Sequence, residues 1–319
     1  MNKKITIITI GVILLGIVIY LIIANTNSPI DKAIDKAVDK AKVEEKTGEP
    51  ANKEEKEPSE EKKDKTEDNV TEKVKDLVTD AVQETIGFFS NNDALVVAIG
   101  DSLTKGIGDE TGNRGYVGML KDALNSKGTH VEFKSYGKRG RRSDQLLEYL
   151  DDPKNEPKVA ASISDADIVL ITVGANDIMR VLKENITNIT VDDFQDARVK
   201  YRERLKKVFE KIYTLNPHTD VYLLGFYNPF TRYFPSIKEL GVIIRNWNEV
   251  GKEVTAQYNN ATYIPTIDLF DDPNVDLFWR DNFHPNYKGY HRIAKRVLEY
   301  LHEEEENSDK DGKAEAPVK

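Results

Sequence analysis

The chain has 319 residues, no cysteine and a formal net charge of −9. Without cysteine, the chain can form no disulfide, use no thiol in catalysis and carry no lipid on a cysteine. The acidic balance and the lack of a basic patch give no support to nucleic-acid binding.

The N-terminus carries an apolar run over residues 5–24, directly after Lys3 and Lys4. About 20 apolar residues suffice to cross a bilayer, and lysines ahead of such a run favour the cytoplasmic side. We therefore expect residues 1–27 to be a single transmembrane anchor, with the rest of the chain outside the cytoplasm. A cleaved signal peptide is the alternative, although the run is long for one and residues 22–24 make a poor cleavage site.

Two segments of different character follow the apolar run. Residues 28–69 are dominated by Lys, Glu and Asp, a composition that predicts a disordered tether. Residues 70–90 carry apolar side chains at helical spacing, which predicts an amphipathic helix. This helix could pack on the folded domain, or it could contact a partner or the membrane surface. We assign the folded domain to residues 91–303 and a disordered acidic tail to residues 304–319.

Strand and helix patterns alternate through the folded domain. Apolar runs predict strands over 94–99, 130–136, 168–173, 221–226 and 262–264. Helical patterns fall over 116–126, 143–150, 191–215, 237–258 and 287–303. Such alternation favours a mostly parallel sheet with helices on both faces. Residues that follow different strands can then meet at the carboxyl edge of the sheet.

The first predicted strand ends in Gly100-Asp101-Ser102, which places a serine hydroxyl on a strand-to-loop turn. A serine hydroxyl is a weak nucleophile until an adjacent base takes its proton. Of the five histidines, only His284 sits in a loop with a carboxylate, Asp281, three residues ahead of it. This spacing lets one turn present both side chains, so that the carboxylate orients the imidazole. We expect Ser102 to be the nucleophile, His284 the base and Asp281 its orienting acid, whereas Asp101 makes local hydrogen bonds.

Gly140 and Asn176 follow the next two predicted strands. A serine nucleophile needs hydrogen-bond donors for the oxyanion that forms during attack. We expect these two residues to complete an oxyanion hole with the backbone N–H of Ser102. Gly137 is a second candidate for the glycine, and both residues could instead serve turns. The adjacent Asp177 is expected to make only local hydrogen bonds.

These four blocks resemble the SGNH hydrolases, also called the GDSL lipase/acylhydrolase family, which is named for its Ser, Gly, Asn and His. The resemblance covers roughly residues 93–303. It implies a three-layer α/β/α, flavodoxin-like fold with a central, mostly parallel five-stranded sheet. It also implies a serine esterase or lipase that cleaves carboxylic esters, here a bacterial, membrane-anchored member, and we expect neither a metal nor a cofactor.

The sequence marks the substrate-binding residues less clearly than the catalytic ones. Residues 226–235 follow the fourth strand and are rich in aromatics, so Tyr227 and Phe230 are candidates for an acyl pocket with Met179 on a second wall. These side chains could equally pack the loop on its own helices. The basic turn 139–142 could attract an anionic substrate or be solvated. The alternatives in function are an O-acetylesterase or acyltransferase that acts on cell-envelope glycans, and a surface-tethered binding domain without catalysis.

Overall fold

The computed structural model describes residues 94–112, 114–125, 130–152, 157–185, 189–230, 237–272 and 274–314. The predicted membrane anchor, charged tether and amphipathic helix, over residues 1–90, lie outside the described residues. Within the described ranges, none of the helices combines the length and the apolar character needed to cross a membrane.

A five-stranded parallel sheet forms the centre of the domain. Its strands are β1 (Ala94–Gly100), β2 (Val131–Gly137), β3 (Ile168–Thr172), β4 (Asp220–Leu224) and β5 (Ala261–Ile264). They lie in the order β2-β1-β3-β4-β5, and each neighbouring pair is parallel. The five predicted strands are thereby confirmed, with ends that differ by one or two residues. The last residue of β1, Gly100, pairs with Gly137 of β2 and Thr172 of β3, so these three strands end side by side.

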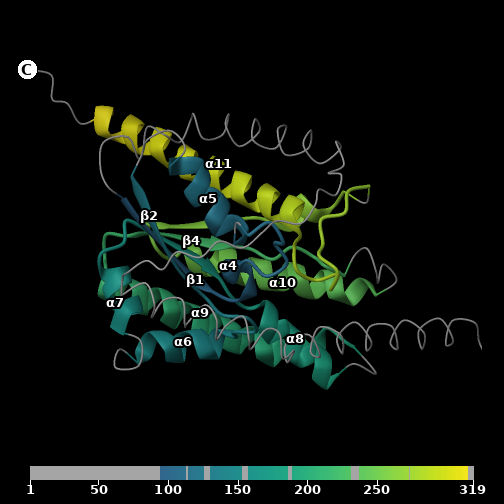
Figure 1. The fold of residues 1–319 in the computed structure, drawn as a ribbon. Helices are drawn as coiled ribbons and strands as arrows, with labels where there is room; N and C mark the ends of the chain where they lie inside the picture. Colours follow the sequence, from purple (N-terminus) through teal and green to yellow (C-terminus); the bar gives the residue numbers. More distant parts are fainter. Residues whose placement is uncertain are drawn as a thin grey trace, which may run out of the picture.

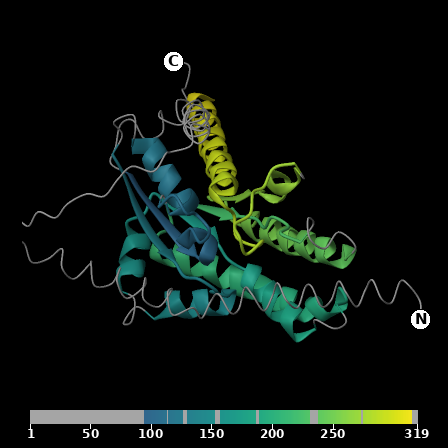
Figure 2. The same cartoon turned by 45° about the vertical axis from the view of Figure 1, so that its right-hand side comes forward.

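Helices cover both faces of the sheet (Figures 1 and 2). One face carries α5 (Gly115–Asn125) and α11 (Tyr287–Ala314). The other carries α6 (Ser143–Asp151), α7 (Pro157–Ser164), α8 (Ala175–Glu184), α9 (Gln195–Leu215) and α10 (Lys238–Thr255). The short helices α4 (Ser102–Lys105), η1 (Asp192–Phe194) and η2 (Ile267–Phe270) complete the order of elements.

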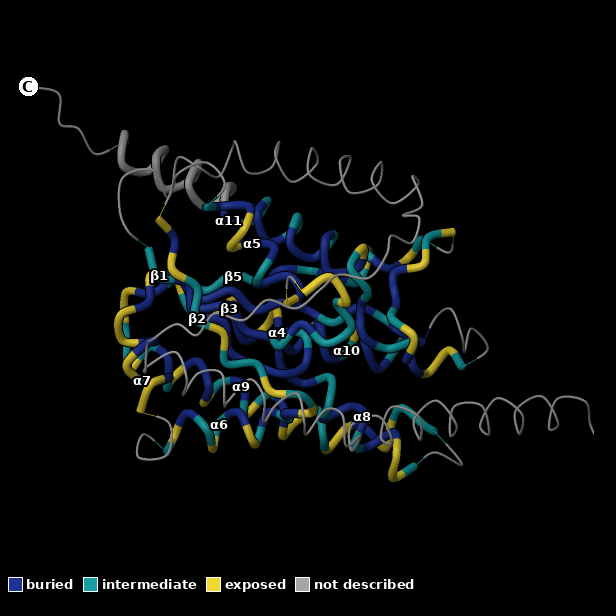
Figure 3. The backbone as a smooth tube through the Cα atoms, in the orientation of Figure 1, coloured by how far each residue is buried: buried dark blue, intermediate teal, exposed yellow. Residues whose placement is uncertain are grey.

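The strands divide their side chains between two apolar cores. Successive residues of a strand point to opposite faces, so Val97 and Ile99 of β1 belong to the core under α6–α10, whereas Val96 and Ala98 belong to the core under α5 and α11. Every residue of β3 is buried, as an inner strand covered on both faces requires. In Figure 3 the inner strands β1, β3 and β4 are mostly buried, whereas the edge strand β2 and the outer sides of α6 and α9 are half-buried or exposed. The predicted three-layer, flavodoxin-like fold is confirmed.

Several helices differ from the predicted ones. The apolar pattern does not predict α7 or α8. Helix α8 begins directly after β3, because Gly174 adopts a φ of 118° and turns the chain at once. Helix α11 runs to Ala314, so the tail expected to be disordered from residue 304 is helical over 304–314. This stretch has no apolar side chains at helical spacing, so its sequence pattern does not predict a helix.

Candidate active site

The turn from β1 into α4 places Ser102 at the carboxyl edge of the sheet. Gly100 has a φ of 147°, and a Cβ there would lie 2.1 Å from the carbonyl oxygen of Thr172. Only glycine lets β1 and β3 approach so closely before the turn. Asp101 then caps α4, because its Oδ1 accepts the backbone N–H of Leu103 at 2.9 Å. Ser102 is therefore the first residue of α4, and the hydrogen bond between Asp101 and Leu103 holds the residues on either side of it.

A hairpin-like loop ahead of α11 carries His284 and Asp281. The backbone N–H of Trp279 donates to the carbonyl of His284 at 2.8 Å, which closes the loop. Asn282 reverses the chain with a φ of 57°, a conformation that asparagine tolerates better than most residues. Asp281 Oδ1 accepts the backbone N–H groups of Phe283 and His284, at 3.0 and 2.9 Å. The spacing of three residues thus lets the carboxylate bind both the backbone and the ring of the histidine.

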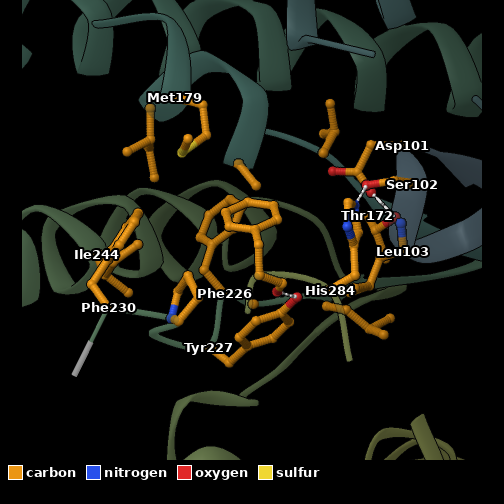
Figure 4. Close-up of a pocket in the computed structure, with 17 residues that line it drawn as sticks. Asp101, Ser102, Leu103, Thr172, Met179, Phe226, Tyr227, Phe230, Ile244 and His284 are labelled. Carbon is orange, nitrogen blue, oxygen red and sulfur yellow. Dashed lines mark hydrogen bonds between the residues drawn. The ribbon is translucent and has the colours of Figure 1, made fainter. Parts of the chain in front are cut away.

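The structure brings Ser102, His284 and Asp281 together in one hydrogen-bonded chain, and Figure 4 shows His284 beside Ser102. His284 Nε2 lies 2.8 Å from Ser102 Oγ, and its Nδ1 lies 2.5 Å from Asp281 Oδ2. The three residues are only 6%, 3% and 9% exposed, in the same order. Burial alone would raise the pKa of Asp281, but the hydrogen bond and charge of His284 outweigh it and hold that pKa below its usual range. An ionised carboxylate, an imidazole and a hydroxyl in this order can generate a nucleophile.

The two predicted oxyanion donors lie on adjoining segments. The Asn176 side chain, in the first turn of α8, donates from Nδ2 to the carbonyl of Arg141 at 3.1 Å. Gly140 belongs to the same turn as Arg141 and has a φ of 74°. Gly137 has a separate role, since a Cβ there would lie 2.3 Å from the backbone nitrogen of Lys105 in α4. Close packing of β2 on α4 explains Gly137, whereas Gly140 lies on the turn that Asn176 contacts.

The two acidic residues next to the blocks have buried partners. Asp101 accepts the Thr172 hydroxyl at 2.9 Å, and burial raises its pKa to about 6. Asp177 reaches well beyond its own turn, because it accepts both the backbone N–H and the hydroxyl of Ser143, at 2.8 and 2.6 Å, and pairs with Arg204 at 3.4 Å. Neither carboxylate therefore makes only the local bonds expected, since Thr172 is also far from Asp101 in the sequence. The bonds of Asp177 join α8 to the start of α6 and to α9.

An apolar groove leads away from Ser102 and His284 (Figure 4). Its empty space is about 560 Å³, part of it open to solvent. The three predicted pocket residues, Tyr227, Phe230 and Met179, all line it. Phe226, from the aromatic segment 226–235, also lines it. The sequence did not single out Ile178 or Ile244, which line it as well. No local signal marks these two, because the packing of α8 and α10 decides which of their faces meets the groove.

The basic turn does not form the solvated loop considered from the sequence. The Arg141 side chain is only 5% exposed overall and donates to the carbonyls of Tyr136 and Gly100. Arg142 pairs with Asp144 at 3.0 Å. Both arginines therefore bind groups of the protein itself. Among the described residues, no cluster of three or more histidine and acidic side chains offers a metal site.

Fold and site together define an SGNH hydrolase. The model of the GDSL-like lipase/acylhydrolase family matches residues 98–292, and the chain belongs to this family. It is 37% identical over 214 residues to the uncharacterised protein YpmR of Bacillus subtilis. The aligned region covers 66% of this chain and 82% of YpmR. It is 27% identical over 208 residues to the spore germination lipase LipC of Bacillus licheniformis, covering 63% of this chain and 92% of LipC.

The fold is also similar to the lipase Lip_vut3 from a goat rumen metagenome. The TM-score is 0.56 at 24% identity, over 64% of this chain and 95% of the lipase. Family membership and fold together make the protein a GDSL-family acylhydrolase, an esterase or lipase by class.

Proposed function

We propose that the protein is a serine esterase that cleaves carboxylic esters through an acyl-serine intermediate. The observation that carries the proposal is the chain of hydrogen bonds from Ser102 through His284 to Asp281. In the first half-reaction, His284 Nε2 takes the proton of Ser102 Oγ while this oxygen attacks the ester carbonyl. The tetrahedral intermediate then expels the alcohol, which receives the proton from His284.

The second half-reaction returns the enzyme to its starting state. A water molecule gives its proton to His284 and attacks the acyl-serine carbonyl. The bond to Ser102 Oγ then breaks while this oxygen takes the proton from His284, and the carboxylic acid leaves. In both tetrahedral intermediates the negative oxygen needs donors fixed in advance. We assign these donors to the backbone N–H groups of Ser102 and Gly140 and to the amide of Asn176.

The apolar groove beside Ser102 favours a substrate whose acyl chain is longer than acetyl. Met179, Phe230 and Ile244 line the end of the groove that lies away from Ser102 and His284 (Figure 4). Each CH₂ group moved from water into an apolar site contributes about 0.8 kcal/mol, which allows up to about a fourfold gain in kcat/KM per methylene. We therefore propose that esters of medium-length fatty acids are better substrates than acetates.

A series of p-nitrophenyl esters tests this function directly. We expect kcat/KM to rise from acetate through butyrate and hexanoate until the groove is filled. Ser102→Ala should abolish turnover of every ester in the series. A maximum at acetate would favour the alternative of a glycan O-acetylesterase, and full turnover by Ser102→Ala would refute the serine mechanism.

We further propose that the catalytic domain works outside the cytoplasm, anchored by residues 1–27. The apolar run over 5–24, preceded by Lys3 and Lys4, supports this proposal. Protease added to intact protoplasts should then release an active domain by cutting the charged segment over 28–69. An activity that stays inside the cell and resists the protease would contradict this orientation.

A further inference from the structure

The turn over residues 137–143 joins the segments that carry the proposed oxyanion donors. It leads from β2 into α6, and Arg141 is its most buried charged residue at 5% exposure. A buried guanidinium needs partners for its donors, because an unpaired charge in the interior is costly. The identity of those partners shows what Arg141 holds in place.

The side chain of Arg141 ties the turn to the strand that ends at the nucleophile. Its Nη1 donates to the carbonyl of Gly100 at 3.3 Å and to that of Tyr136 at 2.8 Å. Gly100 is two residues ahead of Ser102, so one bond reaches the backbone on which the serine sits. The guanidinium also lies 4.1 Å above the ring of Tyr149 in α6, which fixes its plane from the other side.

The backbone of Arg141 contacts the other two donor segments. Its N–H donates to the carbonyl of Lys138 at 3.2 Å and so closes the turn that contains Gly140. Its carbonyl accepts one N–H of the Asn176 amide at 3.1 Å. An asparagine amide has two N–H donors, so this bond can orient the second one toward the oxyanion. A single residue therefore contacts the strand ahead of Ser102, the turn of Gly140 and the side chain of Asn176.

We propose that Arg141 is a positioning residue that sets the relative placement of the three oxyanion donors. The inference rests on the proposed serine-esterase function. Donors act on an oxyanion only when they are fixed at hydrogen-bond distance before the charge forms. Misplacement by about 1 Å can cost about 100-fold in rate. Arginine suits this place because Nη1 donates to two carbonyls while the planar guanidinium stacks on the Tyr149 ring, whereas the lysine ammonium is a compact point charge that cannot stack.

The first test replaces Arg141 and a matched arginine elsewhere. We expect Arg141→Met to lower kcat by about 10- to 100-fold, with a change in KM below about threefold. The control is Arg296→Met in α11, because the Arg296 guanidinium likewise donates to a carbonyl, that of Pro265 at 2.8 Å, outside the site. Arg296→Met should lower the melting temperature but leave kcat unchanged. The kcat of Arg141→Lys is measured as well, and we expect it to fall too. If Arg141→Met does not fold, the kcat of Arg141→Lys decides whether Arg141 has the positioning role.

The second test asks whether Arg141 acts through the oxyanion hole. Asn176→Ala by itself should lower kcat by about 100- to 1,000-fold. If Arg141 works by placing Asn176 and its neighbours, the double variant should lose at least about fivefold less than the product of the two single losses. Losses that multiply, or a wild-type kcat in a folded Arg141 variant, would overturn the inference.

Failure of the proposed function gives a different result. If Ser102→Ala kept its activity, the serine mechanism itself would be wrong, whatever the Arg141 variants showed. If Ser102→Ala is inactive and Asn176→Ala is slow while Arg141→Lys and Arg141→Met turn over normally, only the role of Arg141 is refuted.

Discussion

Asp101 lies buried between the nucleophile and the sheet, and its ionisation is expected to cost the folded protein stability. Burial raises its pKa from 3.8 to about 6, although hydrogen bonds from Leu103 and Thr172 oppose the rise. Both donors bind the same oxygen, Oδ1. Asp101→Asn keeps an acceptor oxygen at that position and removes the charge, so the substitution isolates the cost of ionisation from the cost of losing contacts.

The sign of the effect follows from proton binding. Between the pKa of the unfolded chain and about 6, the unfolded state has released the proton while the folded state retains it. The free energy of unfolding therefore falls as the pH rises through this window and is constant above it. A rise in pKa from 3.8 to about 6 corresponds to about 3 kcal/mol, since each tenfold change in proton affinity is worth about 1.4 kcal/mol.

We expect the unfolding free energy of Asp101→Asn, relative to the parent protein, to increase by about 3 kcal/mol from about pH 4 to about pH 8. Urea denaturation of both proteins across this range measures it, and the titrating groups that do not interact with Asp101 cancel in the difference. A difference that stays the same at every pH would refute the reasoning. It would mean that burial in the folded state does not raise the pKa of the Asp101 carboxyl.

Three further predictions concern the site. Asn176→Ala should lower kcat by about 100- to 1,000-fold with little change in KM or melting temperature, and a destabilised but fully active variant would remove Asn176 from the oxyanion hole. Gly108 has a φ of 99°, and a Cβ there would lie 2.4 Å from the carbonyl oxygen of Pro285. Gly108→Ala should therefore displace the loop that carries His284, and it should lower both kcat and the melting temperature. An unchanged kcat would show that this loop tolerates movement. Met179→Trp should fill the far end of the groove and shift the ester preference toward acetate, whereas Met179→Leu, of similar volume, should not; equal profiles for the two would place the acyl chain elsewhere.

The positions of the strands and of the reacting groups could be predicted from the sequence. The run 168–171 is apolar throughout because both faces of β3 are covered, and such a run is visible without a structure. The Asp281 and His284 pair was visible because a spacing of three residues in a loop brings two side chains to one turn. Parallel topology then places Ser102 at the same edge of the sheet as the residues that follow β2 and β3.

Other parts of the site depend on tertiary packing that no local pattern encodes. The basic turn suggested solvation or anion binding, yet Arg141 is buried because backbone carbonyls from two separate strand ends meet there. Ile244 lies on a predicted helix, but only the packing of α10 turns it toward the groove. The helical extension of α11 to Ala314 carries no apolar stripe, so hydrophobic periodicity does not predict it.

Covalent labelling with a fluorophosphonate tests the central claim most directly. The serine oxygen attacks phosphorus, fluoride leaves, and the adduct is stable enough to be mapped by mass spectrometry. We predict one adduct per chain, on Ser102, which is absent in Ser102→Ala and forms far more slowly in His284→Ala. An adduct on a different serine, or an unlabelled protein that still hydrolyses esters, would contradict the account.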